Sequence, residues 1–234
     1  MRKRRSTIAR SRGTTFGVLV AVLVVLVGAG CTPPPRTPSH RTQAAPAQQL
    51  DQLPVMDRPS RTADYRRSAF GTAWADTDHD GCSQRRDALA ATVDRTRAFT
   101  ERRRGGCAHD VVAGTWTDPY TGQPLTLTDL TDAHQAQQIP IDHVVALALA
   151  YRYGARSWTA ERRLAFATDL SNLQPTSRAT NVSKSDHDPA AWKPRAPYQC
   201  AYATRYVAVK SAYQLPVDPA EKKALRAMLG TCPG

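Results

Sequence analysis

The chain has 234 residues, 32 of them basic and 20 acidic, so its formal net charge is +12. A chain of this length corresponds to one or two domains. A hydrophobic content of 41% with 22% charged residues excludes a wholly disordered chain, a coiled coil and a protein with many membrane spans. Six of the basic residues and none of the acidic ones lie in residues 1–30, so the remainder carries a charge of only +6.

The N-terminus has the organisation of an export signal. The basic stretch Met1–Arg12 precedes an apolar run from Phe16 to Val27, and small residues follow. This apolar run of about 12 residues is shorter than the ~20 residues that a membrane-spanning helix needs. We therefore interpret residues 1–30 as a signal peptide that directs the protein out of the cytoplasm.

Cys31 comes directly after small residues, as the lipid-attachment cysteine of bacterial lipoproteins does. We expect Cys31 to be lipidated and to anchor the protein to the extracellular face of the cell membrane. Gly28 stands where that pattern usually has Leu or Val. The alternatives are an uncleaved anchor and a plain export signal, which would give a secreted protein.

Four further cysteines follow, namely Cys82, Cys107, Cys200 and Cys232. An even number of cysteines in an exported chain predicts two disulfides, for which three pairings are possible. We favour Cys82–Cys107 and Cys200–Cys232, because each closes a short loop and contributes about 3 kcal/mol to stability. A zinc site is disfavoured, because no two of these cysteines are separated by only two residues.

A change in composition divides the exported chain into two parts. Residues 31–61 contain Cys31 and a stretch rich in Pro, Gln, Ala and Thr without sustained periodicity, which predicts a flexible linker. Residues 62–234 have the size of one ordinary domain.

Periodicity, caps and turn residues predict the elements of this domain. In chain order these are a helix over 83–103, two strands within 110–128 around a Pro-Tyr-Thr-Gly turn, a strand over 139–145, helices over 146–153 and 159–167, an extended segment over 172–176, and helices over 177–184, 198–213 and 219–229.

The segment Ile141–Val145 places Asp142 and His143 inside an apolar, strand-like run, where buried polar side chains are unexpected. Asn172 follows His143 by 29 residues, and Asn181 follows nine residues later. In this order and spacing the three residues resemble the HNH, or ββα-metal, endonucleases. The wider string, from DHVVALALAYRYGARSW to SNLQPTSRATNVSKSDHDPAAW, is similar to the HNH domain of secreted actinobacterial proteins and of GmrSD-type restriction endonucleases.

The resemblance implies a fold and a set of residue roles. The fold class would be α+β, with a ββα-metal core, surrounding helices and a small β-hairpin. In this family a neutral histidine is the general base, so His143 takes that role. A single Mg²⁺ or Mn²⁺ would be bound by Asp142 and by the amide oxygen of Asn181. Asn172 would hold the loop that orients His143, and Lys184 would contact a phosphate oxygen.

The predicted function is therefore that of a secreted or lipid-anchored metal-dependent endonuclease that acts on nucleic acid, with DNA favoured over RNA. The run Arg102–Arg104 is either a contact to the phosphate backbone or a solvated helix end. The alternative function is a catalytically inactive nucleic-acid or envelope binding lipoprotein. The intact set of HNH residues favours the enzyme.

A second acidic motif lies upstream. Asp76, Asp78 and Asp80, followed by a glycine, match the start of an EF-hand calcium loop, and Asp87 falls at its twelfth position. The twelfth position is normally Glu and the eighth is normally apolar, whereas this chain has Asp and Ser. An Asp-rich turn before a helix is therefore favoured, and a Ca²⁺ site is the alternative.

Overall fold

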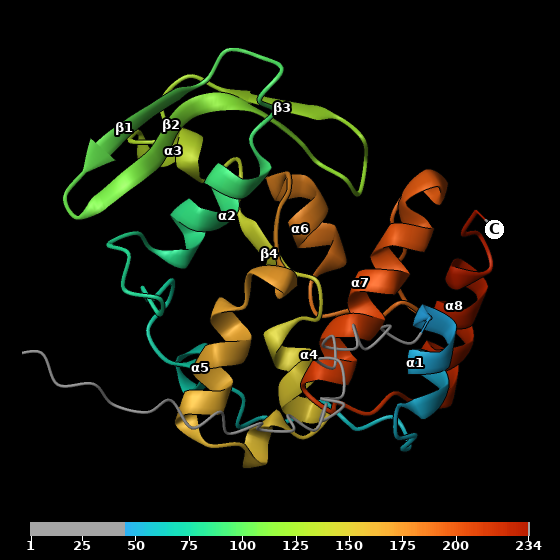
Figure 1. Cartoon of the computed structure of the whole chain (residues 1–234). Helices are drawn as coiled ribbons and strands as arrows, with labels where there is room; N and C mark the ends of the chain where they lie inside the picture. The colour runs from blue at the N-terminus through green and yellow to red at the C-terminus, as the bar shows by residue number, and fades with distance from the viewer. Residues whose placement is uncertain (1–44, 234) are drawn as a thin grey trace, which may run out of the picture. The chain divides into compact units, whose positions relative to one another are not determined.

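A computed structural model describes residues 45–233 of the chain (Figure 1). The predicted signal peptide, the lipidation at Cys31 and the first part of the predicted linker lie outside these residues. None of the helices in residues 45–233 has both the length and the apolar composition required to cross a bilayer.

Helices alternate with two small sheets, which confirms the predicted α+β fold class. The α-helices are α1 (Pro46–Gln52), α2 (Gln84–Thr92), α3 (Ala133–Ala136), α4 (Leu147–Arg152), α5 (Ala160–Thr168), α6 (Arg178–Lys184), α7 (Gln199–Ala212) and α8 (Pro219–Leu229). The strands are β1 (Thr100–Arg104), β2 (Cys107–Thr117), β3 (Pro124–Leu127), β4 (Ile141–His143) and β5 (Leu173–Pro175). Short 3-10 helices are η1 (Arg67–Phe70), η2 (Ala155–Ser157), η3 (Leu170–Asn172) and η4 (Ala196–Tyr198).

Both sheets are antiparallel. In the larger sheet the strand order is β1-β2-β3, and in the smaller sheet β4 pairs with β5. The register of the smaller sheet places Asp142 opposite Gln174 and His143 opposite Leu173. Helix α6 follows β5 directly, so β4, β5 and α6 form the ββα unit that the resemblance implied, with α4 and α5 inserted between its two strands.

The helix expected over residues 83–103 is wrong beyond Thr92. The chain leaves α2 at Val93 in an extended conformation, and the arginine-rich run at 100–104 forms strand β1 instead of a helix end. Gly105 supplies the left-handed backbone, with φ of +62°, that lets β1 turn back and pair with β2. Every residue of β1 is exposed, so the run Arg102–Arg104 faces solvent on a strand.

The linker expected over residues 31–61 contains a short helix. Residues 46–52 form α1, which packs against α7 and α8 (Figure 1). Leu50 and Leu53, spaced three apart, place two buried side chains on one side of this segment. Val55 then forms a parallel bridge with Val217. Burial of this short apolar stripe therefore extends the folded part upstream of the expected start at residue 62.

Both predicted disulfides are present, Cys82–Cys107 and Cys200–Cys232. The first joins the residue before α2's N-cap to the first residue of β2. The second joins the first turn of α7 to the chain just beyond α8. Each disulfide thus fastens one helix to a neighbouring element.

Within residues 45–233, two clusters of buried apolar side chains form the core. One contains residues of α1, α4, α7 and α8, and the other contains residues of α2, β2, β4 and β5. Ile141, at the start of β4, belongs to the second cluster, whereas Val144, just beyond the strand, belongs to the first. The Asp142–His143 pair therefore lies where the two clusters meet.

Candidate active site

Strand β4 carries two adjacent polar side chains, and both are buried: Asp142 is 5% exposed and His143 is 6% exposed. The Asp142 carboxylate accepts a hydrogen bond from the Tyr120 hydroxyl, at 2.7 Å to Oδ2. The Lys184 ammonium lies 3.0 Å from each of its two oxygens and donates a third bond, of 2.8 Å, to the carbonyl of His143. These contacts supply the partners that a buried carboxylate requires.

Lys184 has a different position from the one that the resemblance implied. Its side chain is fully buried, and its ammonium binds Asp142 and the backbone of β4 instead of facing a phosphate. Burial raises the pKa of the Asp142 carboxyl, and the charge of Lys184 and the hydroxyl of Tyr120 oppose that shift. Lys184 therefore orients Asp142 and compensates its charge, and we correct its expected role accordingly.

His143 is held in one tautomer. Its Nε2 lies 2.9 Å from the carbonyl oxygen of Ala167, and because a carbonyl only accepts, Nε2 carries the proton. No described residue bonds to Nδ1, which is thus the basic nitrogen of a neutral imidazole. Burial is the main cause that lowers the pKa of His143 to about 3; the positive charges of Arg67 and Lys184 contribute to this decrease, and the hydrogen bond to Ala167 opposes it.

Asn172 lies in η3 and is fully buried. Its Oδ1 accepts from the backbone N–H of Val145 at 2.8 Å, and its Nδ2 donates to the carbonyl of Val145 at 3.3 Å. Its own carbonyl accepts from the N–H of Val144 at 2.8 Å. Asn172 thus fixes the two residues that follow His143.

The turn between β2 and β3 connects the hairpin to α6. Asp118, fully buried in this turn, accepts at Oδ2 from the N–H of Ser177 at 3.1 Å and from the hydroxyl of Thr180 at 2.9 Å. Its Oδ1 accepts from the N–H of Tyr120 at 3.0 Å. Asp118 therefore fixes Tyr120, which donates to Asp142. It also fixes the start of α6, the helix that carries Asn181.

A polar cavity of about 260 Å³ opens at this point. It is lined by Tyr65, Arg67, Ile141, Asp142, His143, Ala146, Leu147, Ala148, Asn181, Ser185 and Asp186. Arg67 is exposed, and no described residue forms an ion pair or hydrogen bond with its guanidinium. The structure therefore brings Asp142, His143 and Asn181 to one cavity, together with an arginine available to an anion.

The donor atoms of this cavity fit a hard divalent cation. Asp142 and Asn181 offer a carboxylate and an amide oxygen, the ligand types that Mg²⁺ and Mn²⁺ prefer. A carboxylate has about four acceptor sites, so the bonds from Tyr120 and Lys184 leave capacity for a further contact.

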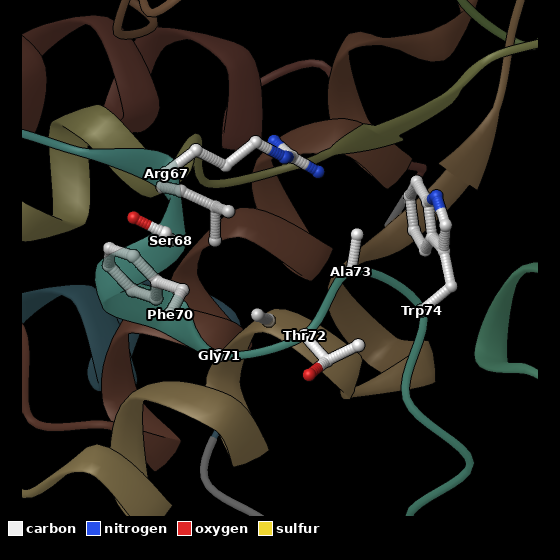
Figure 2. Close-up of a pocket in the computed structure, with 9 residues that line it drawn as sticks. Arg67, Ser68, Phe70, Gly71, Thr72, Ala73 and Trp74 are labelled. Atoms are coloured by element: carbon white, nitrogen blue, oxygen red, sulfur yellow. The ribbon is translucent and has the colours of Figure 1, made fainter.

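A second cavity of about 260 Å³ shares Arg67 and Leu147 with the first. Figure 2 shows Phe70 and Trp74 on opposite sides of the view, with the Arg67 side chain extending toward Trp74. The guanidinium of Arg67 lies 5.8 Å from the centre of the Trp74 ring. The same ring is stacked near His143, with centroids 6.1 Å apart and planes 14° apart. Apolar space thus adjoins the polar cavity.

Sequence reasoning missed three residues of this site: Tyr120, Arg67 and Trp74. The sequence placed Tyr120 only in an expected turn. The signal that could have found it is chemical: a buried Asp142 requires a hydrogen-bond donor, and the Tyr120 hydroxyl is one. Arg67 and Trp74 lie well before the HNH string, and no periodicity connects them to it. Only the tertiary fold brings η1 beside β4.

The antiparallel pair of β4 and β5 followed by α6, with Asp142, His143 and Asn181 around one cavity, agrees with the ββα arrangement that the resemblance implied. The sequence profile of the C-terminal domain of GmrSD restriction endonucleases matches residues 84–228, which is more than half of the chain, and the chain belongs to this family. Membership suggests a nuclease-like function and the use of a divalent metal.

One relative extends the comparison beyond the matched domain. An uncharacterised secreted protein of Arthroderma benhamiae is 38% identical over 223 residues, which cover 94% of this chain and 98% of the relative. No solved structure matches the chain significantly. The secreted relative and the two disulfides indicate export.

Proposed function

We propose that the protein is an exported endonuclease that hydrolyses phosphodiester bonds of nucleic acid, DNA in preference to RNA, with a divalent metal and a histidine base. One observation carries this proposal. A neutral His143 whose Nδ1 has no partner among the described residues lines the same cavity as Asp142 and Asn181. Membership of the GmrSD restriction endonuclease family supports the same activity.

His143 is the proposed general base. Its Nδ1 accepts a proton from the water that attacks phosphorus, while the Nε2–H bond to Ala167 stabilises the imidazolium that forms. The low pKa in the free protein is due first to burial and then to nearby positive charge. A bound phosphate brings negative charge to the cavity and raises that pKa, so the base becomes stronger when substrate is present.

Asp142 and Asn181 are the proposed ligands of Mg²⁺ or Mn²⁺, which when bound supplies Lewis-acid stabilisation of the phosphate and the leaving oxygen. Lys184 and Tyr120 fix the carboxylate of Asp142 from the buried side. Asn172 fixes the backbone after His143 and so orients the base.

The neighbouring groups support a nucleic-acid substrate. Arg67 is exposed at both cavities and suits a backbone phosphate. Trp74 offers an aromatic face beside the apolar cavity, and bases stack on such faces without sequence preference. In this proposal Arg67 contacts a phosphate and Trp74 stacks on a base next to His143.

The test is cleavage of plasmid DNA, linear duplex, single-stranded DNA and RNA by the exported protein, with Mg²⁺ and with excess EDTA. We expect cleavage only with the metal. His143→Ala should lower the rate by about 10²–10⁴, the usual effect of losing one general base. Its binding of DNA should persist, because the variant removes no charge at neutral pH.

The matched control is His134→Ala, which changes an exposed histidine of α3. It should cleave at the wild-type rate. Undiminished cleavage by His143→Ala, or full activity in EDTA, would refute the mechanism. DNA binding without cleavage by the wild-type protein would instead support the inactive binding lipoprotein.

A further inference from the structure

The acidic loop before α2 contains two carboxylate oxygens that are buried without a partner. The carboxylates of Asp76, Asp78 and Asp80 lie within 4.8 Å of one another. Asp76 Oδ1 and Asp87 Oδ2 are both buried and accept no hydrogen bond from any described residue. An unsatisfied buried carboxylate oxygen is costly, so its persistence at two places in one loop calls for a partner.

Asp87 is the more informative of the two. It lies in the first turn of α2, is only 8% exposed, and points toward the loop: its carboxylate lies within 4.8 Å of that of Asp80. Burial raises the pKa of Asp87, and the negative charges of Asp80 and Asp78 raise it further. One oxygen of Asp87 has a partner: His109 Nε2 lies 3.4 Å from Oδ1, a long hydrogen bond that opposes the rise of the pKa, and the same nitrogen lies 3.4 Å from Asp80 Oδ2.

We propose that this loop binds Ca²⁺ through Asp76, Asp78, Asp80 and Asp87, independently of the proposed nuclease site. The two unpartnered oxygens belong to positions 1 and 12 of the loop, which both supply ligands in calcium loops of this spacing. Oxygen donors from four carboxylates suit Ca²⁺ in charge and in chemistry.

The backbone already has the required turn. Gly81, at position 6, has φ of +88°, and a Cβ there would lie 2.6 Å from the backbone of Gly106. Position 7 contributes its carbonyl in such loops, so the disulfide of Cys82, which engages the side chain, does not interfere. Helix α2 begins two residues later and delivers Asp87. The disulfide to Cys107 holds the loop against β2.

The experiment measures Ca²⁺ binding by calorimetry and thermal unfolding of the exported protein after treatment with chelator. We expect one bound Ca²⁺ with a Kd on the order of 0.1–1 mM, the range of extracellular calcium modules. In 10 mM Ca²⁺ the unfolding temperature should rise by about 3–10 °C. Equal Mg²⁺ should not replace this effect.

Two variants locate the site. Asp87→Asn and Asp78→Asn should each weaken Ca²⁺ binding at least about tenfold, and Asp78 makes no hydrogen bond among the described residues that its loss would break. The matched control is Asp129→Asn, an exposed loop aspartate that caps its own turn through Thr131, and it should bind as the wild type does.

Asn181→Ala separates this site from the nuclease cavity, because the Ca²⁺-dependent stabilisation should persist in it. Absence of a Ca²⁺-dependent shift in the wild type would overturn the proposal, as would a shift that survives both loop variants. Binding of Zn²⁺ but not Ca²⁺, lost in His109→Ala and kept in Asp78→Asn, would also overturn it and assign the cluster to His109, Asp80 and Asp87.

Discussion

His143 is buried in a neutral form, so its environment links the stability of the protein to pH. The pKa is about 3 in the folded chain and about 6.5 in an unfolded one, where the ring is solvated. Between these values an unfolded His143 binds more protons than the folded one, so its contribution to stability decreases as pH falls from about 6.5 toward 3. The decrease attributable to one proton is about 1.4 kcal/mol per pH unit.

This linkage is testable with urea unfolding of the metal-free protein at pH 4, 5, 6 and 7. His143→Gln should show a shallower decrease of unfolding free energy with falling pH than the wild type, because it cannot take up that proton. His134→Gln, which changes an exposed ring, should keep the wild-type slope. Equal slopes for all three proteins would mean that the His143 ring is not kept neutral by the fold.

Lys184 neutralises a buried carboxylate, and this predicts a large effect on stability. Lys184→Met should lower the free energy of unfolding by about 3–5 kcal/mol, since it leaves Asp142 buried without a counter-charge. Combining it with Asp142→Asn should restore most of the loss. Lys193→Met, at an exposed position, should change stability by about 0.5 kcal/mol or less. Equal effects of the two lysine changes would contradict the buried pair.

At the scale of elements, the turn between β2 and β3 is the link between the hairpin and α6. Asp118→Ala leaves the N–H of Ser177 and the hydroxyl of Thr180 without their acceptor, and should lower stability by about 2–4 kcal/mol. Because α6 carries Asn181, the variant should also need more Mg²⁺ for half-maximal cleavage. Urea unfolding and a Mg²⁺ titration of DNA cleavage measure the two effects.

The neighbouring change Thr121→Ala is the control, since Thr121 is exposed and bonds only within the turn. It should leave both quantities near their wild-type values. A loss of stability in Asp118→Ala without any change in the Mg²⁺ requirement would show that the turn supports the fold but not the site.

Local signals predicted most elements but failed where tertiary packing decides. Thr159 and Pro219 mark helix starts that the structure confirms, because caps and proline act within one turn of chain. The helix was expected to extend to residue 103, where glycines follow, yet pairing with strand β2 makes this segment a strand. Residues 46–52 were expected to be unstructured, because the segment has no sustained periodicity. The helix is stabilised by packing against α7 and α8, which the local sequence does not reveal.

The same distinction applies to the site. The motif predicted Asp142, His143, Asn172 and Asn181, and the structure brings all of them to one place through the ββα unit. Lys184 is the exception: its side chain is buried and contacts Asp142. The position of a residue in the sequence of α6 does not determine the direction of its side chain, so the sequence could not predict this contact. Tyr120, Arg67 and Trp74 come from distant segments and reach the surroundings of β4 only after folding, so no local sequence pattern predicts them.

At the scale of the whole molecule, the sequence before the described residues makes a prediction about location. The basic start, the apolar run and the small residues before Cys31 should direct export, followed by lipidation of Cys31. Cys31→Ser should therefore move the protein from the membrane fraction to the medium, or leave an unprocessed precursor of larger mass. Fractionation with mass spectrometry measures this. An unchanged distribution and mass would remove the lipoprotein interpretation, and the two disulfides would still indicate export.

Helix α1, near the beginning of the folded part, packs against α7 and α8 at its end. The first cluster of the core therefore cannot be completed before α7 and α8 have been synthesised, since about 150 residues separate them from α1. During synthesis residues 1–30, the predicted export signal, emerge long before α8 does. If residues 1–30 direct export as predicted, this order of synthesis lets the secretion machinery engage the chain before the first cluster has formed.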